Sequence, residues 1–178
     1  MTGITKIMTD PHTDSTLEGL KIRTFRRDDQ KAVYHLYDQG LLAGQIAPND
    51  TGADIDNMRE AYFDNERHHF WVAELDGKVV AMIGVASDEP HTAEVRRLRV
   101  EPAYQKTALA SKLLETAITH CKHHGYLKVR LDTRFERDAA VGLFDHVGFQ
   151  HTRTKSMHGK DLLEFYLDLY RQDKSENE

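Results

Sequence analysis

The spacing of apolar residues changes several times along the chain, and each change predicts a new element of secondary structure. Short apolar runs predict strands near residues 20–25, 70–75, 79–85 and 93–100, and Asp76-Gly77 is typical of a hairpin turn between the second and third runs. Helical spacing predicts one helix with Asp28 as its N-cap and Gly40 after its end, and another over residues 54–65. Residues 41–50 between them predict an irregular loop.

The second half of the chain alternates helices with strands. Residues 109–121 carry the apolar stripe of the longest helix, and 140–147 carry a second stripe. A strand is predicted over 127–131 between these helices, and two more begin near Phe149 and Leu162. The order is strand, two helices, three strands, helix, strand, helix and two strands. It predicts an α/β fold in which a mixed sheet is covered by helices.

Length and composition predict one domain. The chain has 178 residues, and we expect a domain over 20–169, with a disordered tail at 1–19 and a short tail at 170–178. The net charge of −5 argues against a nucleic-acid partner. No apolar run reaches the ~20 residues of a membrane span, and the first sixteen residues do not resemble a signal peptide, so we expect a cytoplasmic protein without a membrane partner. Cys121 is the one cysteine, which excludes an intramolecular disulfide, and it lies on an apolar stripe typical of a core.

The strand over residues 93–100 contains a change of phase. Val95 is apolar at an odd position, whereas Leu98 and Val100 are apolar at even positions. This slip near Arg96 and Arg97 indicates a β-bulge, although an irregular, charged edge strand would produce the same pattern. A loop of small and polar residues follows and leads into the longest helix, whose N-terminus would suit a pyrophosphate.

From this point the chain resembles the GNAT superfamily of acetyl-CoA-dependent N-acetyltransferases, over about residues 20–169. The family's phosphate loop, Q/R-x-x-G-x-G/A, corresponds to residues 105–110, which read QKTALA. A second signature, A-x-x-L-Y-x-x-x-G-F, corresponds to AVGLFDHVGF at 140–149, and HGYLKVRLDT at 124–133 resembles the family's helix-to-strand passage. The resemblance implies the GNAT fold, acetyl-CoA as cosubstrate without a metal, and transfer of acetyl to the amine of a small molecule or peptide.

The resemblance also implies roles for particular residues. Glu94 is the candidate general base, and the alternative is a solvated carboxylate paired with Arg96 or a neighbouring arginine. Backbone groups of the strand after the bulge would pair with the pantetheine arm, and N–H groups of the loop would hold the pyrophosphate. The implied cofactor-binding residues are Leu98, Arg99, Val100, Gln105, Lys106, Thr107, Ala108, Leu109, Ala110, Ser111 and Phe144.

Three departures from the family pattern favour a second interpretation. Ala108 replaces a loop glycine, Arg137 replaces a frequent asparagine, and Phe144 replaces the tyrosine that often protonates the departing thiolate. A non-catalytic GNAT-like domain that binds an acyl-CoA or a protein partner is therefore the alternative. The acceptor stays unidentified, although Asp50, Asp54 and Asp56 would suit a cationic amine. The oligomeric state is also open, with a homodimer among the alternatives.

A group of histidines is a weaker candidate for a site. His120, His123 and His124 share one helix, where residues three or four positions apart lie on one face. Two imidazoles could bind a metal ion, but no carboxylate partner is evident in the sequence. We therefore expect no metal there.

Overall fold

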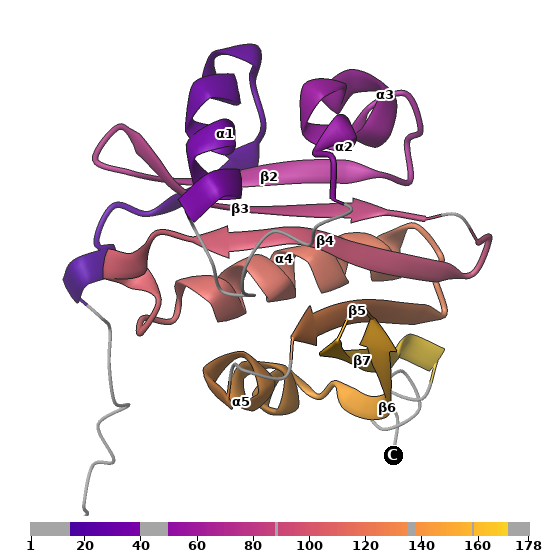
Figure 1. Cartoon of the computed structure of the whole chain (residues 1–178). Helices are drawn as coiled ribbons and strands as arrows, with labels where there is room; N and C mark the ends of the chain where they lie inside the picture. The colour runs from indigo at the N-terminus through magenta and orange to yellow at the C-terminus, as the bar shows by residue number, and fades with distance from the viewer. Residues whose placement is uncertain (1–14, 40–49, 88, 135–137, 158, 171–178) are drawn as a thin grey trace, which may run out of the picture.

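The computed structural model describes residues 15–39, 50–87, 89–134, 138–157 and 159–170, and shows a sheet covered by helices (Figure 1). Three 3-10 turns are present at Ser15–Leu17, Arg27–Asp29 and Pro102–Tyr104. The helices are α1 (Gln30–Gln39), α2 (Ala53–Asp56), α3 (Met58–Tyr62), α4 (Leu109–His123) and α5 (Asp138–Val147). The strands are β1 (Lys21–Thr24), β2 (His69–Leu75), β3 (Lys78–Ala86), β4 (Thr92–Val100), β5 (Lys128–Arg134), β6 (Gln150–Met157) and β7 (Lys160–Asp168).

The seven strands form one mixed sheet in the order β1-β2-β3-β4-β5-β7-β6. Every neighbouring pair is antiparallel except β4 and β5, which run parallel. This confirms the mixed α/β fold that the order of elements predicted. Leu17, inside the expected tail, is buried in the main core, so the chain already packs against the domain before residue 20.

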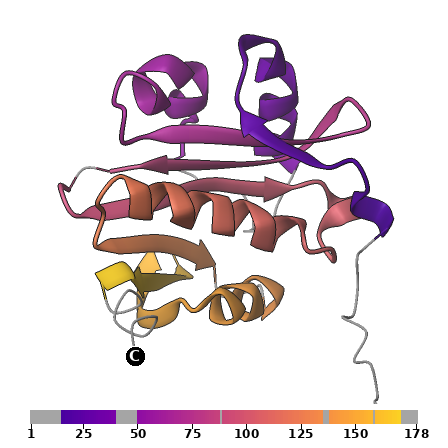
Figure 2. The same ribbon diagram turned by 180° about the vertical axis from the view of Figure 1, so that it is seen from behind.

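Two apolar clusters lie on opposite faces of the sheet because alternate strand residues point to opposite sides. The larger cluster joins α4 and α5 to the sheet, and α4 lies in front of the strands in Figure 2. The smaller cluster joins α1, α2 and α3 to β2 and β3. On the face that carries α1 to α3, most side chains of β5 and β7 are charged or polar, among them Lys128, Arg130, Asp132, Glu164 and Tyr166. We call this part of the sheet the polar face.

Two predicted helix features are wrong. Residues 54–65 form not one helix but α2 and α3, separated at Asn57, which has φ −121° and ψ 49°. The Asn57 amide donates to the Ala53 carbonyl at 2.9 Å, and such a side-chain bond competes with helix continuation. Asp28 is exposed inside a 3-10 turn and is not the N-cap. The carboxylate of Asp29 instead accepts the Arg26 N–H at 2.7 Å, and Gly40 lies outside the described residues.

The predicted β-bulge is confirmed. Met82 on β3 pairs with Arg99 and Gly84 pairs with Arg96, so two residues of β4 stand opposite one residue of β3. Arg97, one of these two, has φ +56°, a left-handed conformation that is rare outside glycine. The extra residue returns Leu98 and Val100 to the face of Ala93 and Val95, which explains the slip in the sequence pattern.

Candidate functional site

Strands β4 and β5 separate beyond three paired residues. Thr92, Ala93 and Glu94 pair with residues 128–130, but β4 continues to Val100 and β5 to Arg134 without further pairs. Each strand keeps its partner on the other side, since β4 pairs with β3 as far as Val100 and β5 with β7 as far as Arg134. We call this unpaired part the strand separation. No strand pairs with β4 along this edge, where an extended ligand can add, although the Leu98 and Val100 carbonyls already accept from the side chains of Arg99 and Gln105, each at 3.1 Å.

The N-terminus of α4 lies just after this edge of β4. The loop is attached to the strand through Gln105, whose side-chain amide donates to the Val100 carbonyl at 3.1 Å. Within the described chain no acceptor pairs with the N–H groups of Ala108, Ala110 or Ser111. The first helical N–H groups have no partner inside a helix, and α4 extends over 15 residues, so this end provides unpaired donors together with a positive dipole end.

Alanine fits the loop at the position where the family has glycine. Ala108 has φ −73° and ψ 4°, a conformation that costs an L-amino acid nothing. Ala108 is exposed, so the methyl group that distinguishes it from glycine does not enter a packed region. This departure therefore introduces no strain into the loop.

Phe144 lies in the core of the α5 side of the sheet. Phe144 is 3% exposed. The centroid of its ring lies 5.4 Å from that of Phe165 and 6.1 Å from that of Phe149. These contacts account for an apolar side chain at this position. Its assignment to the cofactor stays a prediction.

Glu94 is the last residue of β4 that pairs with β5, and both of its carboxylate oxygens accept hydrogen bonds. Oε1 accepts from Nε of Arg96 and Oε2 from Nη2 of Arg130, each at 2.9 Å. Its side chain is 26% exposed. The pairing with arginines is the alternative considered for this residue, and its role as a base stays a prediction.

Asp132 on β5 was not identified from the sequence. It lies two residues beyond the last β4–β5 pair, on the polar face, directly across from Glu164 of β7. Burial by surrounding protein raises its pKa, and the nearby Glu164 and Glu94 carboxylates raise it further. Nothing local in the sequence distinguishes this aspartate, because the neighbours that matter come from two other strands.

Two acidic residues bind Arg97, the residue at the bulge. Asp50 precedes α2, and Asp54 lies in α2. The Arg97 guanidinium donates to Asp50 Oδ1 at 3.0 Å and to Asp54 Oδ2 at 2.9 Å. Tyr62 donates its hydroxyl to Asp54, and the guanidinium lies 5.0 Å from the centroid of the Tyr37 ring. Arginine lowers the pKa of both carboxyls, against the opposing effect of burial. Asp50 and Asp54 thus both bind Arg97, and the three side chains together carry one net negative charge.

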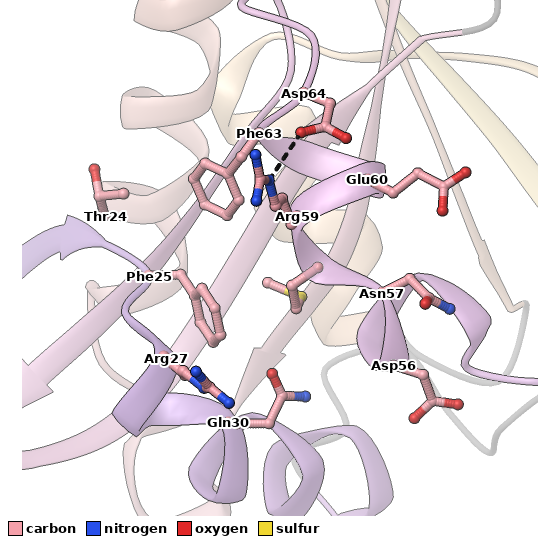
Figure 3. A pocket seen from close by; sticks show the side chains of 11 residues that line it. Thr24, Phe25, Arg27, Gln30, Asp56, Asn57, Arg59, Glu60, Phe63 and Asp64 are labelled. Atoms are coloured by element: carbon pink, nitrogen blue, oxygen red, sulfur yellow. Dashed lines mark hydrogen bonds and ion pairs between the residues drawn. The ribbon is translucent and has the colours of Figure 1, made fainter.

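Several pockets lie beside the sheet. A pocket of about 360 Å³ opens on the polar face. Residues of β5, β6 and β7 line it, together with residues just before β4 and at its start. Its charged lining includes Lys128, Arg130, Arg153 and Glu164. A second, of about 750 Å³, lies between β1, α1, α2 and α3, where Phe25 and Phe63 stack at 6.2 Å and Arg59 pairs with Asp64 (Figure 3). No residue of β4 or β5 lines the second pocket, so it is separate from the strand separation.

The histidines of α4 are stacked and do not converge on one point. The rings of His120 and His124 lie 4.0 Å apart at 27°, and His120 Nε2 lies 2.9 Å from the Arg67 carbonyl. Burial lowers the pKa of His120 to about 4. Over the described residues, no group of three metal-ligating side chains is found. Cys121 is buried with its pKa raised by burial to about 12, which confirms it as a core residue.

The comparisons with known families decide the classification. The model of the Acetyltransferase (GNAT) family matches residues 31–149, which is two thirds of the chain. This chain belongs to the GNAT family. Its fold agrees, because the structure of YncA from Salmonella typhimurium with its cofactor acetyl-CoA superposes with a TM-score of 0.70 at 23% identity, covering 84% of this chain and 94% of that one.

The curated relatives include proteins named N-acetyltransferase and N-acetylaspartate synthetase. A probable N-acetyltransferase camello from Xenopus tropicalis is 32% identical over 104 residues, which are 57% of this chain and 48% of the relative. An N-acetylaspartate synthetase from Mus musculus is 30% identical over 99 residues, which are 55% of this chain and 33% of the relative. The matched part spans half or less of these relatives. Among the described helices, none has the length and apolar character needed to cross a membrane.

Proposed function

We propose that this chain transfers the acetyl group of acetyl-CoA to the amine of an acceptor. The observation that carries the proposal is the strand separation, because it presents the unpaired edge of β4 next to the unpaired N–H groups at the start of α4. An extended chain ending in a pyrophosphate matches this order of donors. The family assignment supports the same cosubstrate.

The residues present fit acetyl-CoA. Backbone groups of Leu98, Arg99 and Val100 would pair with the pantetheine arm like an added strand. N–H groups between Lys106 and Ser111 would bind the pyrophosphate. Thr133 on β5 adds a donor and acceptor beside the separation, since its hydroxyl is buried and has no hydrogen-bond partner among the described residues. A buried hydroxyl without a partner is costly, so a polar ligand group there would be stabilising.

The acceptor side of the reaction belongs on the polar face. The pocket of about 360 Å³ is large enough for a small molecule, and its lining carries the positive side chains of Lys128, Arg130 and Arg153 against the carboxylates of Glu89 and Glu164. Glu164 offsets part of this charge, and the Lys128 ammonium lies over the Tyr166 ring. We therefore propose an acceptor that carries a carboxylate near its amine, as an amino acid does, which agrees with the name N-acetylaspartate synthetase of one relative.

The test measures binding and turnover separately. Acetyl-CoA at millimolar concentration should raise the melting temperature, with ATP as a control for non-specific anion binding. Release of the free thiol is then followed with a panel of amino acids and polyamines, and amino acids should react faster. Stabilisation without thiol release from any amine would favour the non-catalytic binding domain. The absence of stabilisation would refute both forms of the proposal.

A further inference from the structure

The strand separation has one carboxylate on its β5 side. Glu94 pairs with Arg130 at the end of the β4–β5 ladder, so Arg96 and Asp132, two residues further along these parallel strands, stand on either side of the point where the strands diverge. Alternation along β5 puts Asp132 on the polar face with Arg130. Glu164, its cross-strand neighbour, lines the acceptor pocket, and so does Arg130. Asp132 therefore lies between that pocket and the bulge.

The three carboxylates of this region differ in their partners. Glu94 receives a guanidinium on each oxygen, and an amine would have to displace Arg96 or Arg130 to reach it. Glu164 is likewise paired with Arg153 and Lys155. Over the part of the chain that the structure describes, no hydrogen bond or ion pair reaches Asp132. Asp132 is also an exposed residue, so an incoming ammonium group can approach it.

The charges around Asp132 come from four strands. Glu164 of β7 and Glu94 of β4 raise its pKa, while Lys155 of β6 and Arg130 of β5 lower it. Burial by the surrounding strands is the largest influence, and the net result is a raised pKa. Asp132 is nonetheless an exposed residue, and it lies beside the acceptor pocket without lining it. A carboxylate with a raised pKa takes a proton more readily near neutral pH than an ordinary one.

We propose that Asp132, and not Glu94, accepts the proton of the acceptor amine. The assignment rests on the function proposed above. One proton passes from the ammonium to Asp132, and the freed electron pair forms the N–C bond to the acetyl carbonyl. The C–S bond then breaks, its electron pair leaves with sulfur, and the second proton lost by nitrogen reaches the thiolate through solvent. Asp132 finally releases its proton to water.

The experiment compares three variants of Asp132 and Glu94, and a control variant of Asp64, with one amine substrate. Asp132→Asn should lower kcat/KM for acetyl transfer ~100-fold at pH 7, the scale of a positioned base, with the Kd for acetyl-CoA within twofold. The loss should shrink above the pKa of the amine, which then arrives without its proton. Asp132→Glu should recover a large part of the rate. Glu94→Gln should lower kcat/KM less than tenfold, and Asp64→Asn, which removes one carboxylate of an exposed ion pair, serves as the control for lost charge.

The outcomes separate this assignment from the proposed function. A wild-type chain that transfers acetyl to no amine refutes the proposed function and the assignment with it. A wild-type chain that is active, with Asp132→Asn equally active, refutes the assignment alone. A ~100-fold loss in Glu94→Gln with a small loss in Asp132→Asn returns the role to Glu94. Collapse of acetyl-CoA binding in Asp132→Asn also overturns the inference, because the carboxylate would then support the strand.

Discussion

Replacement of Arg97 by alanine tests whether the bulge of β4 is held by charge. Arg97 is 13% exposed, and its partners Asp50 and Asp54 are 21% and 16% exposed. The substitution leaves two carboxylates without their counter-charge in a region with little water. Loss of one partner of a buried pair costs about 3–5 kcal/mol, and the residual exposure places this pair near the lower end. We expect Arg97→Ala to lower the free energy of unfolding by about 3 kcal/mol.

Glycine at the same position separates charge from backbone strain. Arg97→Gly loses the same ion pairs, but glycine accepts φ +56° without the penalty of about 1–2 kcal/mol that an L-residue incurs there. Arg97→Gly should therefore be more stable than Arg97→Ala by about 1 kcal/mol, which is the reverse of their order in an ordinary strand. This reversal is specific to the bulge.

The pH dependence of this stability difference follows from the carboxyls of Asp50 and Asp54. The pKa values of both carboxyls are lowered in the folded protein. The stability that they contribute is therefore present above their unfolded pKa near 4, and it is lost as the pH falls through their folded pKa values. Urea unfolding of wild type, Arg97→Ala and Arg97→Gly should show the full difference at pH 7 and a smaller one below about pH 4. The melting temperature of Arg97→Ala should fall by roughly 6–12 °C. A change of under 0.5 kcal/mol at pH 7, or alanine more stable than glycine, would refute the reasoning.

Three shorter predictions concern the cofactor loop, the core of α5 and the histidine stack. Ala108→Gly should keep or tighten acetyl-CoA affinity, and Ala108→Leu should weaken it at least tenfold in a titration; equal affinities would place the pyrophosphate elsewhere. Phe144→Tyr should leave acetyl-CoA affinity unchanged and turnover equal or higher, whereas a large loss in melting temperature without a kinetic gain would assign Phe144 to the core alone. Burial keeps His120 neutral, so stability should fall as the pH drops from about 6.5 towards 4, and chemical denaturation of His120→Gln should show a weaker dependence in that range.

Local spacing along the chain was sufficient for the elements that fill the core. The stripe at residues 109–121 predicted α4, and seven residues of that helix are buried. The change of phase between Val95 and Leu98 predicted the bulge, because a strand has a side-chain period of two and an inserted residue must shift it. The order of motifs also predicted the family. Each of these signals lies in a short stretch of the chain or in the order of such stretches.

The charges at the site depended on the tertiary structure. Asp50 and Asp54 are about 45 positions from Arg97, and Glu164 is 32 positions from Asp132, so spacing gave no sign of either pairing. The break at Asn57 also escaped prediction, because helix propensity alone does not reveal that its side chain binds the Ala53 carbonyl. An aspartate looks the same in every sequence. Whether it neutralises an arginine or stands free with a raised pKa is decided by which strands fold beside it, since its ionisation depends on burial and on charges a few ångströms away.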